Sequence, residues 1–456
     1  MIGAIIKPEL IELIRERGFT KLRDILCEFE PVEIAEIFDA FDPADQAVFL
    51  RILPNEVAAD VFEYLPIEQQ EPLLHALGNQ EVAEILNEMD PDDRTAVFEE
   101  LPASLTQRLI NLLDPEERRI ATQLMGYPED SVGRLMTPEY VAVREEWTVM
   151  QVLAELRRIG QERESFNQMF VLDDSGRLTG VVRLRNLVTS DTATLVRELE
   201  ETHVISLDVH QSEEEAVELF RKYDRTVLPV VNRERKLLGV VTVDDILDVA
   251  EEAATEDIQM LGGVEALETS YLKTGLLTMF RKRAVWLTVL FLGQTLTVFA
   301  MENQRAALES AALLILFLPL VISSGGNTGS QTSTLVVRAL GTQDVEPGDI
   351  WRVLGREFTT ALLLGSLLAS LAFLVVVVFQ NAFGAGFLVY GLAIGTSVLT
   401  VVLFGGLSGA LFPFALSRLG FDPAVCSTPF VTTVVDVSGL IIYFSLARSI
   451  LAACGV

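Results

Sequence analysis

Cysteine and histidine are scarce in this sequence of 456 residues, with three of each. Cys27, Cys426 and Cys454 have no paired spacing, so we expect neither a disulfide framework nor a zinc site, and a reducing compartment is indicated. The histidines likewise lack partner spacing, and nothing indicates an enzyme. The N-terminal segment lacks the long apolar core of a signal peptide, so we expect the first 270 residues to be cytoplasmic.

Positive charge is also scarce in the first 270 residues, which carry a net charge of −32, whereas the remainder carries +2. A strongly acidic surface repels nucleic acid and anionic lipid, so neither is expected as a partner of this part. Cations and basic proteins remain as candidates. The change near residue 270 predicts a boundary between an acidic soluble part and a membrane part.

Prolines recur every eleven to thirteen residues through the N-terminal part, at positions 31, 43, 54, 66, 91, 102 and 115, with one gap filled by Gly78 and Asn79. Proline is tolerated in the first turn of a helix, and Asp42, Asp90 and Asp114 are suitable N-caps. The pattern therefore predicts a superhelix of about five helical hairpins over residues 1–130.

A β-α-β-β-α pattern follows twice, over 131–190 and 191–250. The copies resemble a tandem pair of CBS domains, which commonly bind adenine nucleotides such as ATP. Thr242 and Asp245 match the usual ribose-contacting pair, whereas the first copy has Arg183 and Asn186 at those places. Nucleotide binding is therefore expected in the second copy rather than the first.

Five apolar segments follow, at roughly 284–301, 310–338, 358–380, 386–417 and 427–451. Each approaches or exceeds the roughly 20 residues that cross a hydrocarbon core. Basic residues gather before the first segment, between the second and third, and between the fourth and fifth, whereas the loops at 302–309 and 381–385 have almost none. The positive-inside rule thus predicts a five-span domain over 271–456, embedded in the cytoplasmic membrane, with the C-terminus outside.

The second apolar segment contains the stretch "SSGGNTGSQTST", residues 323–334. Its three glycines weaken a helix, and irregular backbone at membrane depth survives only inside protein or facing water. Small polar residues suit both a pore lining, through Asn327 and Thr328, and a close crossing of two helices. Composition alone leaves these two interpretations open.

Asp436 lies in the last apolar segment, in "PFVTTVVDVSGLIIYF", with Thr432, Ser438 and Gly439 around it. An intramembrane carboxylate is costly and indicates a functional site, and no basic residue lies at comparable depth. We favour a cation site over a protonated carboxyl bonded to Ser438 or to the threonine-rich second segment, and over a proton relay. Hard oxygen ligands and one carboxylate per chain suit a hydrated Mg²⁺, held between the two copies of Asp436 in a symmetric dimer.

The segment 244–270 leaves the second CBS copy as a predicted connecting helix with a carboxylate stripe formed by Asp244, Asp248, Glu252 and Glu256. Like charges four residues apart destabilise a helix. The stripe is either a solvated face or a metal site. In the second case divalent ions bridge it to carboxylates of the N-terminal part, such as Asp90, Asp92 and Asp93.

The whole chain resembles the MgtE family of magnesium channels or transporters. The matching motifs are "LMTPEYVAV" at 135–143, "TVLPVV" with "GVVTVDDILDV", "ATEDI" at 254–258, "GGNTGSQ" at 325–331, "RAL" at 338–340 and "DVSGLIIYF" from Asp436. The resemblance implies a homodimeric channel with its ion site at Asp436. It also implies cytoplasmic Mg²⁺ ligands, which would include Asp90, Asp224, Asp245, Glu256 and Asp257.

These observations predict a multidomain protein of class α, α/β and all-α membrane domains that imports Mg²⁺ and is closed by cytoplasmic Mg²⁺. At low Mg²⁺, repulsion between carboxylates separates the soluble domains and opens the pore. Two other functions remain: a carrier of another divalent ion (Mn²⁺, Co²⁺ or Ni²⁺), including one coupled to protons, and a membrane-anchored nucleotide sensor.

Overall fold

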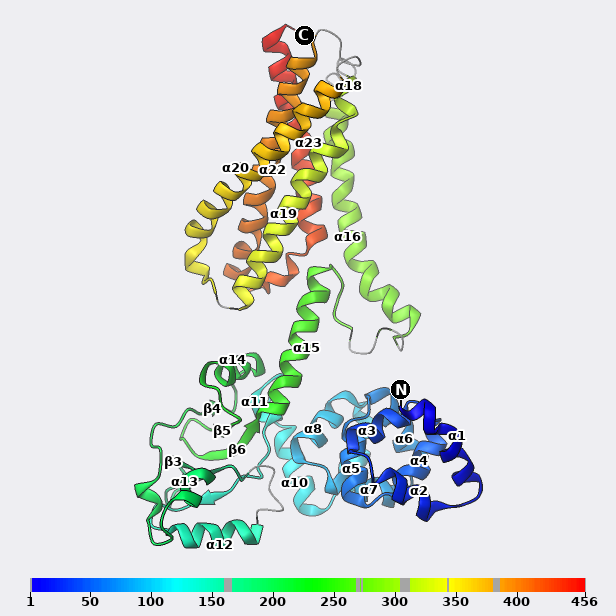
Figure 1. Ribbon diagram of the computed structural model, residues 1–456, viewed down its shortest axis with the longest axis vertical. Helices are drawn as coiled ribbons and strands as arrows, with labels where there is room; N and C mark the ends of the chain where they lie inside the picture. The colour runs from blue at the N-terminus through cyan, green and yellow to red at the C-terminus, as the bar shows by residue number, and fades with distance from the viewer. Residues whose placement is uncertain are drawn as a thin grey trace. The chain divides into compact units, whose positions relative to one another are not determined.

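The computed structural model describes residues 2–159, 166–267, 271, 274–303, 312–342, 344–379 and 386–455 (Figure 1). The chain forms two compact units, Met1–Glu251 and Glu252–Val456. Most of the loop at 302–309 and nearly all of that at 381–385, both used in the orientation argument, lie outside the described residues.

Short helices build the N-terminal part of the first unit (Figure 1). They are α1 (Ile2–Arg15), α2 (Phe19–Leu26), α3 (Pro31–Phe38), α4 (Pro43–Ile52), α5 (Asn55–Glu63), α6 (Ile67–Ala76), α7 (Asn79–Glu88), α8 (Pro91–Glu100), α9 (Ala103–Ile110) and α10 (Pro115–Leu124). Most of these helices pack on the one after next, as α3 does on α5 and α4 on α6. The predicted helical superhelix is confirmed.

The prolines mark the helix starts, as predicted. Proline is the first residue of α3, α4, α8 and α10, and the N-cap of α5, α6 and α9. Of the three predicted aspartate caps, only Asp42 bonds through its side chain, accepting from Ala44 and Asp45. Asp90 and Asp114 also occupy the N-cap position, as predicted, but without a side-chain cap bond. The carboxylate of Asp90 is thereby free for other neighbours.

Two small sheets follow, one in each CBS-like copy. The first copy contains α11 (Val132–Leu135), β1 (Ala142–Val143), α12 (Val149–Ile159), β2 (Gln168–Leu172), β3 (Leu178–Arg183) and α13 (Leu184–Thr189). The second contains β4 (Leu207–Asp208), α14 (Glu213–Tyr223), β5 (Val227–Val231) and β6 (Leu237–Thr242), and leads into α15 (Val243–Leu261). In both sheets the first strand pairs parallel with the second, and the second antiparallel with the third, so the internal duplication is confirmed.

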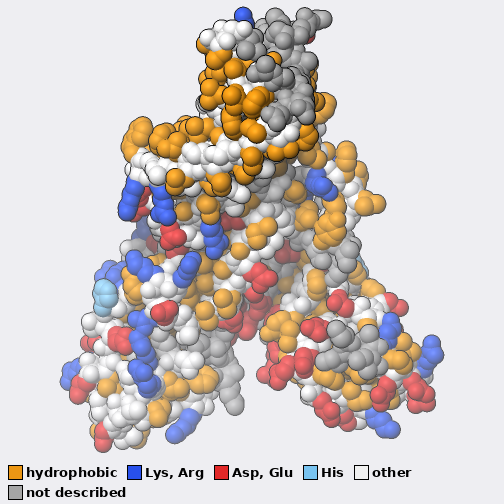
Figure 2. Space-filling view, turned by 45° about the horizontal axis from the view of Figure 1, so that its top comes forward, with side chains coloured by type: hydrophobic (Ala, Val, Ile, Leu, Met, Phe, Trp, Pro, Cys, Tyr) orange, Lys and Arg blue, Asp and Glu red, His pale blue; other side chains and the backbone are white. Residues whose placement is uncertain are grey.

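Long helices dominate the second unit. They are α16 (Leu276–Asn303), α19 (Leu318–Gly341), α20 (Ile350–Val378), α22 (Phe387–Arg418) and α23 (Thr428–Cys454), with the short α18 (Ala312–Ile315) before α19. Four of them, α16, α20, α22 and α23, are long and apolar enough to cross a membrane. Hydrophobic side chains lie exposed on these helices, as Figure 2 shows, including Phe291 and Leu363. The prediction of five spans thus depends on α19, which has 24 residues but contains the polar stretch.

Contacts between these helices show that they alternate in direction. Along α20 and α22, Gly365 meets Leu399 and Gly391 meets Phe373, so the two helices are antiparallel. Between α19 and α22, the residue numbers of the contacting positions increase together, from Gly325 with Gly405 to Gly329 with Gly409, so these two helices are parallel. Corresponding contacts make α23 antiparallel to α19 and parallel to α16. The order of directions is that of a chain that crosses a layer five times.

Candidate ion site and carboxylate clusters

The polar stretch of α19 is continuous helix, so the irregular backbone considered for it is absent. Two of its glycines instead permit close packing on α22. A Cβ on Gly405 would lie 2.3 Å from the carbonyl oxygen of Gly325, and one on Gly409 would lie 2.2 Å from that of Gly329. The helix-crossing interpretation is therefore right for this face of α19, where backbone meets backbone.

Another face of α19 meets α23 and the carboxylate of Asp436. A Cβ on Gly326 would lie 3.5 Å from Asp436 Oδ1 and 3.2 Å from the methyl group of Thr432. One helical turn on, Ser330 Oγ lies 3.0 Å from Thr432 Oγ1. Asp436 lies eight residues into α23, about 12 Å along the helix. Small and hydroxyl-bearing residues thus surround a carboxylate at membrane depth.

Several hydroxyl groups of α19 and α23 donate their hydrogen bonds to their own helices. Thr432 Oγ1 donates to the carbonyl of Thr428 at 2.9 Å, and Thr433 Oγ1 to that of Pro429 at 2.8 Å. On α19, Ser324 donates to the carbonyl of Leu320 at 2.7 Å. Each bond uses the single hydroxyl hydrogen and leaves oxygen lone pairs available to accept.

The other residues predicted to line the pore lie on different faces of α19 and α23. Asn327 is exposed, and its side chain donates to Ser323 Oγ at 3.4 Å. Thr328 is buried, and its methyl group lies 3.7 Å from the Cβ position of Gly406 on α22. Gly439 also packs on α22, against Val401, whereas Ser438 is half-buried. Among the described residues no hydrogen bond is recorded between Asp436 and Ser438, so the geometry gives no support to a protonated Asp436 bonded to Ser438.

Sequence reasoning missed two polar contacts at membrane depth. Gln294 Nε2 of α16 donates to Asp436 Oδ2 at 3.3 Å, and Thr332 Oγ1 donates to Glu357 Oε2 of α20 at 2.9 Å. The sequence did offer a signal for Gln294, because it is an amide alone in the apolar run "VLFLGQTLTVFA". The pairing with Asp436, 142 positions away, becomes visible only in three dimensions.

In the first unit, carboxylates of α5 and α8 face the start of α15. Burial, followed by the charges of Asp93 and Asp90, raises the pKa of Glu63 to about 8. Burial, followed by the charge of Asp245, raises the pKa of Asp93 to about 7. Burial also raises the pKa of Asp245. These groups hold protons near neutral pH because their negative charges are crowded and poorly hydrated.

The cluster unites several predicted ligands with one that was missed. The charges of the predicted ligands Asp90, Asp245 and Asp248 raise the pKa of Asp93, also a predicted ligand. The addition is Glu63, whose pKa the charges of Asp93 and Asp90 raise. Asp224, in contrast, is exposed at the end of α14 in a left-handed conformation. Glu252 is also exposed. Within the described residues, no three His, Cys, Asp or Glu side chains are arranged to hold a metal ion directly.

The later part of α15 belongs to the second unit, where a smaller group of charges lies. Burial raises the pKa of Asp257, as do the charges of Asp422 and Glu256, whereas Arg338 lowers it. Asp257 Oδ2 also lies 3.9 Å from the Cβ position of Gly341 at the end of α19. The predicted pair Glu256 and Asp257 thus gains Asp422, which sequence reasoning had left aside as a loop residue.

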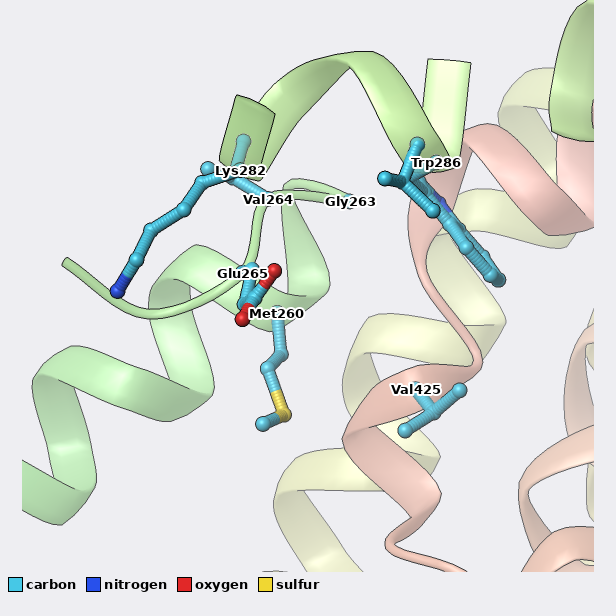
Figure 3. A pocket seen from close by; sticks show the side chains of 8 residues that line it. Met260, Gly263, Val264, Glu265, Lys282, Trp286 and Val425 are labelled. Atoms are coloured by element: carbon cyan, nitrogen blue, oxygen red, sulfur yellow. The ribbon is translucent and has the colours of Figure 1, made fainter. Parts of the chain in front are cut away.

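The end of α15 contacts α16 and the segment before α23 around an apolar pocket (Figure 3). Gly263 ends the helix with φ +72°, and a Cβ there would lie 2.7 Å from the ring of Trp286. Trp286 Nε1 donates to Ser427 Oγ at 3.0 Å. Lys282 donates to the carbonyl of Ala266. The helix end is therefore fixed against the first residues of α23.

The predicted nucleotide pair is formed in the second CBS-like copy. Thr242 Oγ1 donates to Asp245 Oδ2 at 2.7 Å. In the first copy, Arg183 instead forms an ion pair with Glu201 at 3.0 Å. Arg183, Glu201, His203 and Arg225 line a small cleft between the two copies. Its basic groups suit a phosphate-bearing ligand.

Three family models match the chain: an MgtE intracellular N domain at 29–130, CBS domains at 132–191 and 196–252, and a divalent cation transporter domain, MgtE, at 318–446. The magnesium transporter MgtE of Thermus thermophilus is 40% identical over 97% of this chain and 98% of its own length. That of Bacillus subtilis is 30% identical over 96% of both chains.

Solved structures resemble the soluble part. The cytosolic domain of the Mg²⁺ channel MgtE in complex with ATP is 40% identical, with a TM-score of 0.51, and covers 53% of this chain and 98% of that one. The soluble part of a magnesium transporter is 26% identical, with a TM-score of 0.53, and covers 55% of this chain and 99% of that one. With its three kinds of domain matched in order and a relative matched along nearly its full length, the chain belongs to the MgtE family of divalent cation transporters, which are not enzymes.

Proposed function

We propose that this protein is a channel or transporter that carries Mg²⁺ into the cell through the cytoplasmic membrane. The observation that supports this most is the carboxylate of Asp436, which lies at membrane depth with an amide as its hydrogen-bond donor. Among the described residues no basic group forms an ion pair with it. A charge kept in that position is tolerated if a mobile cation compensates it.

Magnesium suits this environment better than softer metals. The groups around Asp436 are hydroxyls, an amide and a carboxylate, whereas thiolates and imidazoles favour zinc or copper. Mg²⁺ usually keeps several waters and is held by one or two carboxylates. In a homodimer, two copies of Asp436 would share one hydrated ion on the symmetry axis. The names of the relatives, magnesium transporters, agree with this ion.

The alternating helix directions support five membrane crossings. The four apolar spans account for α16, α20, α22 and α23. Because α16 and α23 are parallel, the crossings counted from α16 to α23 must be odd in number, and a fifth crossing is needed between α16 and α20. We infer that α19 is this crossing, shielded from lipid by α22 and α23. With the N-terminal domains in the cytoplasm, an odd number of crossings leaves the C-terminus outside.

Flux in liposomes tests the transport function. Purified protein should carry Mg²⁺ down a gradient, Asp436→Asn should abolish the flux while the protein remains folded, and the exposed loop variant Asp344→Asn should leave it unchanged. Normal flux through Asp436→Asn would refute the site. Flux measured with Mn²⁺, Co²⁺ and Ni²⁺ would identify another preferred ion. Uptake driven by a pH gradient would identify coupling to protons. Absence of flux for every ion would favour a nucleotide sensor.

We further propose that cytoplasmic Mg²⁺ closes the pore by neutralising the two carboxylate clusters. One cluster contains Glu63, Asp90, Asp93, Asp245 and Asp248, and the other contains Glu256, Asp257 and Asp422. The raised pKa values support this because they report uncompensated negative charge. Since no three carboxylates directly surround one point among the described residues, the ion would bind partly through its own waters.

Removing charges from both clusters tests the gating. The triple variant Asp245→Asn, Glu256→Gln, Asp257→Asn should conduct Mg²⁺ that millimolar cytoplasmic Mg²⁺ no longer suppresses. The control variant has the same change in charge at three exposed residues, Glu9 and Glu12 of α1 and Glu16 in the turn after it. If the triple variant is inhibited as strongly as this control, the clusters have no role in closure.

An adenine nucleotide is a second proposed ligand, at the cleft of the CBS pair. The basic groups of Arg183, His203 and Arg225 line the cleft and would face its phosphates. Thr242, which lies opposite the cleft residue Val227 in the register of β5 and β6 and bonds to Asp245, would contact its ribose. The ATP complex of the related cytosolic domain supports this. ATP should raise the unfolding temperature of the wild type and not that of Thr242→Val. An equal rise in both would refute the assignment to this pair.

A further inference from the structure

Helix α16 lies along α23 in a fixed register. Trp286 Nε1 bonds to Ser427 Oγ at 3.0 Å, the Cβ position of Gly293 lies 3.3 Å from the methyl group of Thr433, and Gln294 Nε2 lies 3.3 Å from Asp436 Oδ2. In these three contacts the residue numbers increase along both helices, as they do when two parallel helices pack in one register. Gln294 therefore does not meet Asp436 by chance rotation of an isolated side chain.

Gly293 makes the contact possible. A Cβ at that position would lie 3.3 Å from the methyl group of Thr433, so a side chain there would require Thr433 to shift by a few tenths of an ångström. With glycine there, the neighbouring Gln294 comes within hydrogen-bond distance of Asp436. The two oxygens of the carboxylate then face different helices, Oδ2 toward Gln294 of α16 and Oδ1 toward Gly326 of α19.

We propose that Gln294 is a positioning residue that sets the affinity of the Asp436 site for its cation. This inference rests on the proposed transport function. The amide N–H fixes the direction of one carboxylate oxygen while the carboxylate keeps its full negative charge. A lysine or arginine in this place would neutralise the charge that the cation needs, and an apolar residue would leave the carboxylate free to rotate.

The amide has a second use, because its carbonyl oxygen accepts hydrogen bonds. While Nε2 holds Asp436, Oε1 can accept from a water of a hydrated ion bound to the carboxylate. Mg²⁺ demands a near-ideal octahedral arrangement and releases its waters reluctantly, so fixed acceptors around the hydrated ion favour its binding.

Two isosteric variants test this in opposite directions. Gln294→Met removes the hydrogen bond and should raise the half-saturating Mg²⁺ concentration for flux in liposomes about tenfold, since a bond to a charged group contributes roughly a decade in an equilibrium constant. Gln294→Glu adds a negative charge beside Asp436 and should lower that concentration while slowing the maximal flux. The matched control is Thr288→Val on the same helix, whose hydroxyl bonds only to the carbonyl of Ala284.

A merely structural role for Gln294 would not shift the two half-saturating concentrations in opposite directions. If both variants keep the wild-type value, or shift it in the same direction, the inference is overturned. If Gln294→Met does not fold, Gln294→Glu alone decides, because an unchanged or raised value contradicts the expectation. Failure of the transport function itself is distinguished by wild-type protein that carries no Mg²⁺, or by Asp436→Asn that carries it normally.

Discussion

Mg²⁺ binding to the cytosolic unit should release protons near neutral pH. The pKa of Glu63 is about 8 and that of Asp93 about 7, so at pH 7 roughly nine-tenths of the first group and half of the second are protonated. An ion that binds the carboxylates must displace these protons. We expect a release of roughly 1 to 1.5 protons per loaded cluster.

Calorimetry of full-length protein in detergent measures this number, if Mg²⁺ is titrated in two buffers of different protonation enthalpy. Glu63→Gln should lower the release by about one proton, because its neutral amide has no proton to lose. Glu36→Gln, an exposed residue of α3, should leave it unchanged. A wild type that binds Mg²⁺ without releasing protons would refute the charge crowding deduced for α5, α8 and α15.

The same carboxylates fix the sign of the pH dependence of stability. In the folded chain Glu63 and Asp93 keep protons well above the ordinary pKa of about 4 that they have when unfolded. Between these values the folded state binds more protons than the unfolded state, so its stability falls as pH rises from about 4 to 8. Saturating Mg²⁺ should flatten this dependence at its alkaline end.

Two further predictions concern packing and ion pairing. Gly405→Ala should lower the unfolding temperature, since a Cβ 2.3 Å from the carbonyl oxygen of Gly325 forces α19 and α22 apart at a cost of at least about 1–3 kcal/mol. The control Gly355→Ala meets nothing within 4 Å inside α20 and should not lower the unfolding temperature, because alanine is the better helix former. Equal unfolding temperatures of the two variants would contradict the packing. Arg94→Met should destabilise the N-terminal helices by about 3–5 kcal/mol in denaturant unfolding, because the buried guanidinium bonds to Glu117 at 2.6 Å and to the carbonyl of Leu86. The control Arg119→Met breaks an exposed pair and should match the wild type.

Local sequence signals predicted the elements of the fold well. Proline fixes its own φ and lacks an N–H, so it is favoured in the first turn of a helix, and Pro31, Pro43 and Pro91 do begin helices. Pro8, Pro72 and Pro413, which lie outside the regular spacing, are inside helices. The duplicated strand and helix pattern likewise predicted both small sheets. Aspartate caps were less certain, because the carboxylate of Asp90 has long-range neighbours that compete with its own helix.

The candidate site was predictable only in part. Asp436 could be identified from the sequence, because an ionisable residue inside an apolar segment stands out without knowledge of its neighbours in space. The role of each glycine in α19 was not, since Gly325 and Gly326 are adjacent in sequence but face different helices. Gln294, Glu63 and Asp422 acquire their significance from neighbours on other helices, which no local periodicity encodes.

The back-bonded hydroxyls of α19 and α23 have one more consequence. Because Thr432, Thr433 and Ser324 spend their only hydrogens on their own carbonyls, they offer neighbouring solutes electron pairs and no donor. In the proposed pore these three hydroxyls would therefore favour a cation over chloride or phosphate, and among the described residues the side-chain donors there are the amides of Gln294 and Asn327.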